Sequence, residues 1–373
     1  MLRLTRSRAV VVAALLAVPL GAAVTMNALA DDPAPHVEVE LSITDVHKRI
    51  LGVDYTAWGF NGQVPGPVIR ITQGTELSIK LRNSHSEPHS FHTHFQHYPI
   101  SSDGSSHTLP IGAVPHQRDD PLGMTGLTSQ IDTSDYGLER FQSGVNPIGI
   151  YEPRRDEDIA RPGETRYYNY TAGEVGTFVY HCHVFPVEEH IEHGLMGMII
   201  VYPKGWTWDE LPQPQLQFGD LNTDATVTAP DGTRYYEDVV MLSDLDMSGV
   251  TEKALVPLVE DTGRIGLVNF AAWADPYYLG PVPDNTLMRV VIGNLGIEPH
   301  SWHIHGHNFD VLEKFDPAKR VSFRTDTLLI APGQSYETVL TARELGFWFV
   351  HDHMTSRAYA GMIGWLAVVE NPS

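Results

Sequence analysis

Residues 180–183 read Tyr-His-Cys-His and contain the only cysteine of the 373-residue chain. If this segment is a β-strand, successive side chains point to opposite faces, so that His181 and His183 face one way and Cys182 the other. A thiolate with two imidazoles suits a blue-copper site, whereas imidazoles alone suit copper, zinc or iron. A lone cysteine cannot form an internal disulfide, so Cys182 is a free thiol or a ligand. We expect it to join a copper site to a second metal cluster.

Four His-x-His pairs occur in the chain, two in each half. They are His92/His94, His181/His183, His303/His305 and His351/His353. The heptapeptide at 88–94 returns at 299–305 with two changes, and a Pro-Gly pair begins nineteen residues before both His181 and His351. The chain is therefore two copies of one unit. On strands each pair presents both imidazoles to one side, so eight imidazoles would converge where two domains face each other and could hold three metal ions.

Many Gly and Pro residues separate short runs rich in Val, Ile, Thr and aromatic residues, which predicts β-sandwiches. We expect one domain over 31–210 and a second over 211–373. Between the last histidine of the heptapeptide and the Pro-Gly pair the first copy spans 68 positions and the second 27. The first copy therefore carries an insertion of about forty residues within 106–161. Such a long irregular segment is usually functional or an interaction surface.

Residues 1–30 have the pattern of a secretory signal: three arginines, an apolar run and Ala28-Leu29-Ala30 before Asp31. The apolar run is short for a membrane span, which disfavours an uncleaved anchor. We therefore expect a secreted protein, extracellular or in the periplasm or cell envelope, with no membrane span after the signal is removed. The net charge is −21 and the 46 acidic residues are scattered, which argues against nucleic acid as a partner.

These motifs resemble those of multicopper oxidases, and their arrangement is similar to the two-domain, laccase-like members whose type 1 copper sits in the N-terminal domain. The resemblance covers essentially the whole mature chain. It implies an all-β fold of two cupredoxin-like Greek-key β-sandwich domains. It also implies four coppers per chain, one of type 1, one of type 2 and two of type 3, and a homotrimer whose trinuclear sites lie between subunits.

The resemblance further implies a ligand set for each copper. The type 2 copper would be held by His92 and His303. The type 3 pair would be held by His94, His181, His183, His305, His351 and His353. The type 1 copper would take His89, Cys182 and a histidine after Cys182, and electrons would enter the protein at Cys182.

Two overlapping frames fit the rest of the type 1 site. One uses His190 with Leu195 as the axial residue, and the other uses His193 with Met198. The second repeat favours the first frame, because its Gly-Met-Ile-Gly at 361–364 aligns with Gly-Leu-Met-Gly at 194–197. A non-coordinating Leu195 would leave a three-coordinate copper and raise its potential.

Three further residues have expected roles. Asp352 stands at the position that matches Cys182 and supplies a hard oxygen in place of a thiolate, so the second repeat should hold no blue copper. His300, which matches His89, is then a relic or a support for neighbouring ligands. Asp103 resembles the acidic residue that delivers protons to the trinuclear site in this family. Reduction of oxygen to water consumes four protons, so such a residue is needed there. Asp103 is alternatively part of an ordinary Asp-Gly turn.

The expected reaction couples one-electron oxidation of a small-molecule donor, a phenol or aromatic amine, to four-electron reduction of dioxygen to water. The main alternative is a copper nitrite reductase, which has a similar layout but a catalytic centre of one copper with three histidines. A metallo-oxidase acting on cuprous or manganous ion is a second alternative. A non-catalytic copper-binding protein would predict Met-rich or His-rich tracts, and the ten methionines are dispersed.

Overall fold

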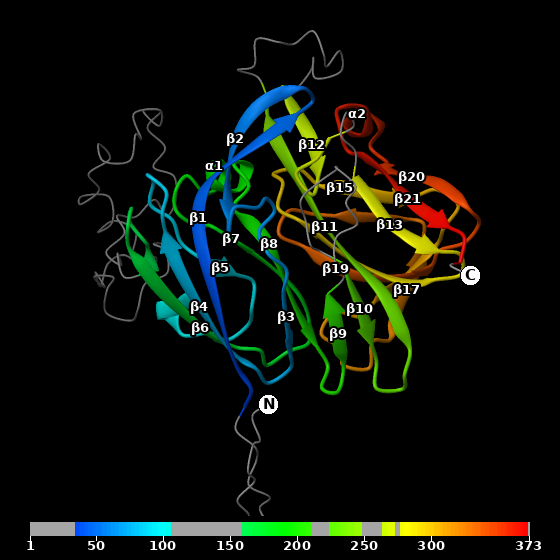
Figure 1. Cartoon of the computed structure of the whole chain (residues 1–373), viewed down its shortest axis with the longest axis horizontal. Coiled ribbons are helices and arrows are strands. Elements are labelled where there is room, and N and C mark those ends of the chain that lie inside the picture. The colour runs from blue at the N-terminus through cyan, green and yellow to red at the C-terminus, as the bar shows by residue number, and fades with distance from the viewer. Residues whose placement is uncertain (1–33, 106–157, 211–223, 248–262, 273–276, 372–373) are drawn as a thin grey trace, which may run out of the picture. The chain divides into compact units, whose positions relative to one another are not determined.

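The computed structural model describes residues 34–105, 158–210, 224–247, 263–272 and 277–371 (Figure 1). Nearly all of the regular structure in these residues is β-strand, which confirms the predicted all-β class. The predicted signal, nearly all of the predicted insertion and the expected domain boundary at 211 lie outside them. No helix among them is long and apolar enough to cross a membrane.

The first domain is a sandwich of two four-stranded sheets, ordered β2-β1-β4-β6 and β3-β8-β7-β5. Its strands are β1 (His36–Ile50), β2 (Val53–Phe60), β3 (Ile69–Thr72), β4 (Glu76–Asn83), β5 (His92–Thr93), β6 (Thr165–Thr171), β7 (Gly176–His181) and β8 (Met196–Tyr202). Apolar residues alternate along β4, where Leu77, Ile79 and Leu81 are buried. They pack against side chains of the other sheet, such as Phe178 and Ile199, and form the core of this domain.

The second domain repeats the arrangement. Its strands are β9 (Thr207–Glu210), β10 (Ala225–Thr228), β11 (Arg234–Asp246), β12 (Arg264–Val268), β13 (Tyr277–Pro283), β14 (Leu287–Asn294), β15 (His300–Ile304), β16 (Phe309–Leu312), β17 (Val321–Thr325), β18 (Thr327–Ile330), β19 (Ser335–Thr341), β20 (Gly346–Asp352) and β21 (Ile363–Val369). One sheet has the order β17-β16-β19-β14-β11-β10-β9, with β12 paired to β11, and the other β13-β21-β20-β15-β18. Because β9 pairs with β10, the chain has joined this domain's sheet by Thr207.

The register of the strands shows the duplication directly. β1 runs parallel to β4 with Ile43 opposite Asn83, and β11 runs parallel to β14 with Leu242 opposite Asn294. Each asparagine donates its side-chain amide to two backbone carbonyls further along the chain. The two domains therefore share strand pairing and loop anchoring as well as sequence motifs.

A short helix follows the strand that leads to Cys182, and another follows its counterpart. These are α1 (Val187–Glu192) and α2 (Thr355–Tyr359). The sequence predicted an extended strand through His183, but β7 ends at His181 because its partner β8 begins only at Met196. Cys182 and His183 therefore lie in the connection just beyond the strand.

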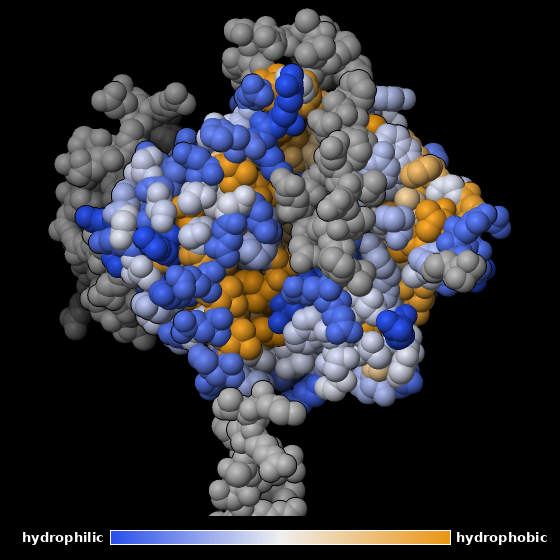
Figure 2. Space-filling model, in the orientation of Figure 1, coloured by the Kyte–Doolittle hydropathy of each residue, from blue (hydrophilic) through white to orange (hydrophobic). Residues whose placement is uncertain are grey.

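A buried ion network crosses between the domains. Arg70 of β3 contacts Glu237 of β11, with 3.0 Å between Nε and Oε1. Arg289 pairs with Glu237 and also with Glu337 (2.7 Å), which in turn pairs with Lys319 (2.8 Å). Burial raises the pKa of Glu337, but Arg289 and Lys319 outweigh it and hold that pKa at about 2. The surface of the molecule is mixed: Figure 2 shows hydrophilic residues over much of one face, with smaller apolar patches between them.

Candidate metal centres

Cys182 lies with His89 and His190 in a buried group that we call the Cys182 cluster. Its Sγ is 3.2 Å from Nδ1 of His190 and 3.7 Å from Nδ1 of His89, and these two nitrogens are 3.1 Å apart. The backbone N–H of Ser90 donates to the sulfur, with 3.4 Å between N and Sγ. One thiol and two imidazole nitrogens thus surround a single point, which is the donor set of a blue-copper site.

Three separate segments build the Cys182 cluster. His89 precedes β5 and exchanges two backbone hydrogen bonds with Ala160 (3.0 and 2.8 Å). Cys182 follows β7, and His190 lies on the buried side of α1. Backbone pairing and one helix face therefore fix the three side chains before any metal binds.

Burial is the largest electrostatic influence on these three groups. It lowers the pKa of His89 to about 2 and that of His190 to about 4, and neighbouring imidazoles act in the same direction. It raises the pKa of the Cys182 thiol to about 11. Both imidazoles are therefore neutral near pH 7, the form that ligates metals, while the thiol needs a bound cation in order to ionise.

The predicted frame of His190 and Leu195 lies at Cys182. Leu195 is fully buried in the same apolar cluster as Cys182. Its N–H donates to the His190 carbonyl (3.2 Å), and its carbonyl accepts from the Cys182 N–H (3.0 Å). The backbone of Leu195 therefore ties the two candidate ligands together, and its side chain supplies no donor atom.

The alternative frame of His193 and Met198 lies elsewhere. His193 caps the end of α1, where its Nδ1 donates to the Glu189 carbonyl (2.8 Å). Its ring stacks on Trp58, with 4.1 Å between centroids. Met198 packs in a different apolar cluster from Cys182. The structure thus does not bring this pair to the sulfur.

Four histidines gather on the first domain in what we call the first histidine group: His92, His94, His181 and His183. The ring centroid of His92 lies 5.6, 5.2 and 4.8 Å from those of the other three, in that order. In three of them Nδ1 donates to a backbone carbonyl. The acceptors are Asp103 for His92 (2.6 Å), Gly333 for His94 (3.2 Å) and Cys182 for His181 (2.8 Å). Because a carbonyl only accepts, the ring proton sits on Nδ1 and Nε2 keeps a lone pair for a metal.

The second histidine group lies on the second domain and consists of His303, His305, His351 and His353. The ring centroid of His303 lies 5.1, 5.3 and 5.1 Å from those of the other three, in that order. Nδ1 of His303 donates to the Asp326 carbonyl (2.7 Å) and Nδ1 of His351 to the Asp352 carbonyl (2.8 Å). The Nε2 atoms of His305 and His351 face each other at 3.1 Å. A hydrogen bond from Nδ1 to a backbone carbonyl therefore orients imidazoles in both repeats.

Burial also keeps histidines of both groups neutral. It is the largest cause that lowers the pKa of His94 to about 4 and that of His181 well below 6.5, with nearby imidazoles adding to it. The pKa values of His305 and His351 are lowered for the same two reasons. Neutral imidazoles offer a nitrogen lone pair to a metal, so this set of side chains fits copper well.

Within one chain the two histidine groups are separate. Ligand atoms of three members of each group lie within 4.8 Å of one another, and the described residues form these as two distinct sets. The described residues of one chain therefore offer two distinct sets of candidate imidazole ligands.

Two family models, both described as multicopper oxidase, match the chain over residues 42–117 with 154–205 and over residues 263–372. The two matches include the Cys182 cluster and both histidine groups. The chain belongs to the multicopper oxidase family. A solved structure titled "Crystal structure of multicopper oxidase" shares its fold, with a TM-score of 0.59, 23% identity, and coverage of 90% of this chain and 89% of that one. Two cupredoxin-like domains, predicted from the motifs, are thus confirmed.

Curated relatives of this multicopper oxidase include proteins named as nitrite reductases. A probable nitrite reductase-hydroxylamine oxidoreductase fusion protein of Kuenenia stuttgartiensis is 27% identical over 91% of this chain and 32% of the relative. A copper-containing nitrite reductase of Neisseria meningitidis is 24% identical over 86% of this chain and 66% of the relative. The chain spans between about a third and two thirds of the length of these relatives.

In this multicopper oxidase Asp103 lies against the first histidine group. Its backbone carbonyl holds His92, and its carboxylate Oδ1 accepts from the Tyr98 hydroxyl (2.8 Å). The other oxygen, Oδ2, is buried and has no hydrogen-bond partner among the described residues. Burial, with the Asp103 carboxylate acting in the same direction, raises the pKa of Tyr98 above its usual range, so the phenol stays a donor.

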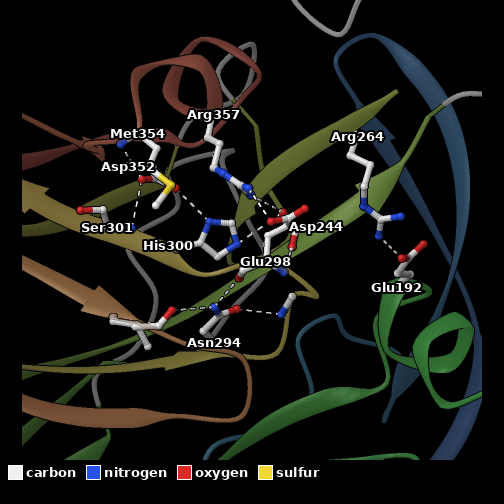
Figure 3. Close-up of polar contacts among 12 residues, drawn as sticks. Glu192, Asp244, Arg264, Asn294, Glu298, His300, Ser301, Asp352, Met354 and Arg357 are labelled. Atoms are coloured by element: carbon white, nitrogen blue, oxygen red, sulfur yellow. Dashed lines mark hydrogen bonds and ion pairs between the residues drawn. The ribbon is translucent and has the colours of Figure 1, made fainter. Parts of the chain in front are cut away.

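The second domain carries an ionic cluster where the first carries Cys182 (Figure 3). Asp352 accepts from His300 Nδ1 (2.9 Å) and from the backbone N–H groups of Ser301 (3.0 Å) and Met354 (2.9 Å). Burial lowers the pKa of His300, but Asp244 and Asp352 outweigh it and the pKa is raised above 6.5. The carboxylate at the position of the thiolate therefore favours the protonated form of the His300 imidazole.

Arg357 completes this cluster, although an arginine carries no metal-ligand signal in the sequence. It precedes Gly361 by four residues, as His190 precedes Gly194, so it occupies the position of the missing histidine ligand. Its guanidinium lies 3.5 Å from Asp244 and 2.7 Å from Glu298 (Figure 3). The three residues that match His89, Cys182 and His190 thus pair with one another or with nearby carboxylates.

His85 is the other functional candidate that the sequence did not reveal. Its Nδ1 is 2.8 Å from Nε2 of His89, and its ring lies 4.7 Å from that of Trp58. It precedes His89 by four residues, but the matching position of the second repeat is Gly296, so the repeat comparison gave no signal.

Proposed function

We propose that this protein is a laccase-like oxidase that takes single electrons from a small-molecule donor, a phenol or aromatic amine, and reduces dioxygen to water. The observation that carries the proposal is the combination of a buried Cys-His-His cluster with two groups of four histidines, one on each domain. A blue-copper site alone would suit electron transfer, whereas eight further imidazoles suit a cluster of metals.

The donor sets fit four coppers per chain. His89, Cys182 and His190 would hold the type 1 copper, with Leu195 beside it as a non-coordinating axial residue. His92 and His303 would hold the type 2 copper. The type 3 pair would be held by His94, His181, His183, His305, His351 and His353. When bound, the coppers supply one-electron transfer and the reduction of dioxygen, chemistry that the side chains cannot perform alone.

The chain itself joins the two kinds of centre. Cys182 is flanked by His181 and His183, so its sulfur is connected to two members of the first histidine group through adjacent peptide units. His181 Nδ1 also donates to the Cys182 carbonyl at 2.8 Å, which adds a hydrogen-bonded path. These connections give electrons a short route from the Cys182 cluster to the first histidine group.

Asp103 is placed to handle protons. Its Oδ2 is buried and unpaired in the described structure, while Tyr98 fixes the other oxygen. A carboxylate held in this way beside His92 would accept a proton from solvent and release it toward oxygen as that is reduced. Its backbone carbonyl meanwhile keeps His92 in the ligating tautomer.

We further propose that the active form is a homotrimer, exported from the cell. The two histidine groups lie on different domains and form distinct sets within one chain, which supports the proposal that a second copy supplies the other half of the trinuclear site. The sheet that carries the second group also exposes large apolar side chains, with Leu329 57% and Phe347 70% exposed. Apolar residues at such positions are typical of a surface that another subunit covers.

A copper nitrite reductase is the second candidate, because one relative is named a copper-containing nitrite reductase and another a probable nitrite reductase fusion protein. Such an enzyme would need three imidazoles at a single copper between subunits. The two histidine groups offer eight, including His353, whose ring stacks on His351 at 5.6 Å. The surplus of oriented imidazoles favours the oxidase.

Copper quantitation and optical spectroscopy on the purified protein test the proposal. We expect four coppers per chain, an intense visible band from Cys182 bonded to copper, and a near-ultraviolet band from the coupled pair. Oxygen uptake with a simple phenol should be fast and nitrite reduction slow. Two coppers per chain with nitrite turnover would instead support the reductase.

A pair of variants provides the control. His190→Ala should abolish the visible band, whereas His193→Ala should keep it, because only His190 faces the sulfur. Loss of the band in His193→Ala alone would show that the ligand frame is wrong.

A further inference from the structure

The second nitrogen of His89 has an unusual partner. Its Nε2 lies 2.8 Å from Nδ1 of His85, and the backbone N–H of Glu87 also points at that Nδ1, at 3.3 Å. A backbone N–H only donates, so Nδ1 of His85 is an acceptor and Nε2 of His89 carries the proton. Nδ1 of His89 is then the bare nitrogen, and it is the one that faces Cys182.

The same deduction fixes the far side of His85. With Nδ1 as its acceptor, neutral His85 carries its proton on Nε2, which lies 3.2 Å from Oδ1 of Asp45. The side chain of His85 is 7% exposed and that of Asp45 is 57% exposed. A hydrogen-bonded line therefore runs from the buried cluster through His89 and His85 to a carboxylate in solvent.

The ligand rings themselves are poorly exposed. His89 is fully buried and His190 is 5% exposed. Trp58 packs edge-on against both, with centroids 5.4 and 5.2 Å away. A donor therefore has little direct access to either ring, and His85, which contacts His89, offers an indirect route.

The second repeat has no thiolate, and it carries different residues at the positions of Asp45 and His85. The strand registers place Asp244 at the position of Asp45, two residues after Leu242 and Ile43 respectively. Asp244 is buried and lies 3.4 Å from His300, because Gly296 leaves room where His85 stands in the first repeat. A Cβ at Gly296 would fall 2.3 Å from the Asp244 carboxylate. His85 and an exposed Asp45 thus occur in the repeat that has the Cys182 cluster, whereas Gly296 and a buried Asp244 occur in the repeat that lacks it.

We propose that Asp45 and His85 form the electron entrance of this protein. The reducing substrate docks against the Asp45 carboxylate, and its electron passes through His85 and His89 to the type 1 copper. The donor loses one electron and the copper goes from Cu(II) to Cu(I). This inference rests on the proposed function, since it requires a type 1 copper at Cys182.

The entrance selects donors by charge. Among the described residues the exposed Asp45 carboxylate has no ion pair other than that with His85, so it attracts cationic donors and those that offer a hydrogen-bond donor, such as aromatic amines and phenols. It repels anionic reductants.

Anaerobic stopped-flow reduction of the blue band tests this with two simple reagents, hexaammineruthenium(II) and hexacyanoferrate(II). The variants are Asp45→Asn and, as the matched control, Glu38→Gln. Glu38 is exposed on the same strand, seven residues away, and its substitution changes the net charge equally. Seven residues of strand separate the two sites by about 23 Å, beyond the screening length at ordinary salt.

We expect Asp45→Asn to slow the cationic reagent by roughly three-fold at about 0.1 M salt, where the screening length is about 10 Å, and to speed the anionic one, with both effects fading at about 1 M salt. Glu38→Gln should change neither rate. Equal effects of the two variants would overturn the entrance and leave the proposed function intact. A wild-type protein without a blue band would instead overturn the proposed function, and the entrance with it.

A second measurement does not depend on copper. In the metal-free protein labelled with ¹⁵N-histidine, His89 should be the Nε2–H tautomer, and His85→Phe should shift it toward a mixture of tautomers. Asp45→Asn should change the His85 signals and leave His89 largely as it is. A wild-type His89 that is protonated on Nδ1 would contradict the hydrogen-bonded line.

Discussion

Replacing Asp352 with Asn tests whether an ion pair has taken over the structural role of a metal in the second domain. Asp352 is buried and binds His300 and two backbone N–H groups. The amide oxygen of Asn can keep the backbone bonds, but the charge that stabilises protonated His300 is lost. Breaking a buried ion pair costs about 3–5 kcal/mol, and we expect the lower end because these bonds persist. That corresponds to a fall of roughly 6–12 °C in the Tm of this domain.

The penalty should depend on pH in a defined direction. The pKa of His300 is raised above 6.5 in the folded protein. A raised pKa contributes stability that is fully present below the unfolded value, near 6.5, and is lost as the pH rises through the folded value. The difference in Tm between the parent protein and Asp352→Asn should therefore be largest below pH 6.5 and shrink above it.

Differential scanning calorimetry of the metal-free proteins from pH 5.5 to 9 measures this. Asp326→Asn is the matched control, because Asp326 is exposed, lies near the second histidine group and uses only its backbone carbonyl to hold His303. It should leave the Tm within about 2 °C, as surface substitutions usually do. A penalty for Asp352→Asn that is absent or independent of pH would refute the ion-pair account.

Three further substitutions have defined outcomes. Leu195→Met places a thioether beside Cys182 and should lower the type 1 reduction potential in a redox titration, whereas an unchanged potential would place residue 195 away from the copper. Asp103→Asn should slow oxygen uptake by roughly 10²-fold without changing anaerobic reduction of the blue band, and an equal effect on both rates would argue against a proton role. Glu237→Gln removes the buried anion that Arg70 and Arg289 share and should cost about 3–5 kcal/mol by urea unfolding, whereas a loss within 0.5 kcal/mol would show the network to be dispensable.

The sequence was sufficient for the fold class and for the order of the metal motifs. His-x-His spacing and an internal repeat can be recognised in the sequence alone, because neither depends on how the chain packs. The preference for His190 over His193 also came from the repeat, because the glycines at 194 and 361 mark the same turn.

Tertiary contacts explain what the sequence did not reveal. Arg357 carries no metal-ligand signal, and only its contacts with Asp244 and Glu298 show that it completes a substitute for the missing copper site. His85 could not be recognised for a different reason. A histidine close to a motif in sequence gains a role only when the structure shows which nitrogen it contacts, here Nε2 of His89. The end of β7 at His181 depends on where its neighbour β8 begins, which no local pattern encodes.

Crystallography of the copper-loaded protein, with anomalous data collected at the copper edge, tests the proposed copper sites most directly. We expect one copper among His89, Cys182 and His190, and three coppers between the first histidine group of one subunit and the second histidine group of its neighbour. A single copper between those groups, or none at Cys182, would contradict the proposal.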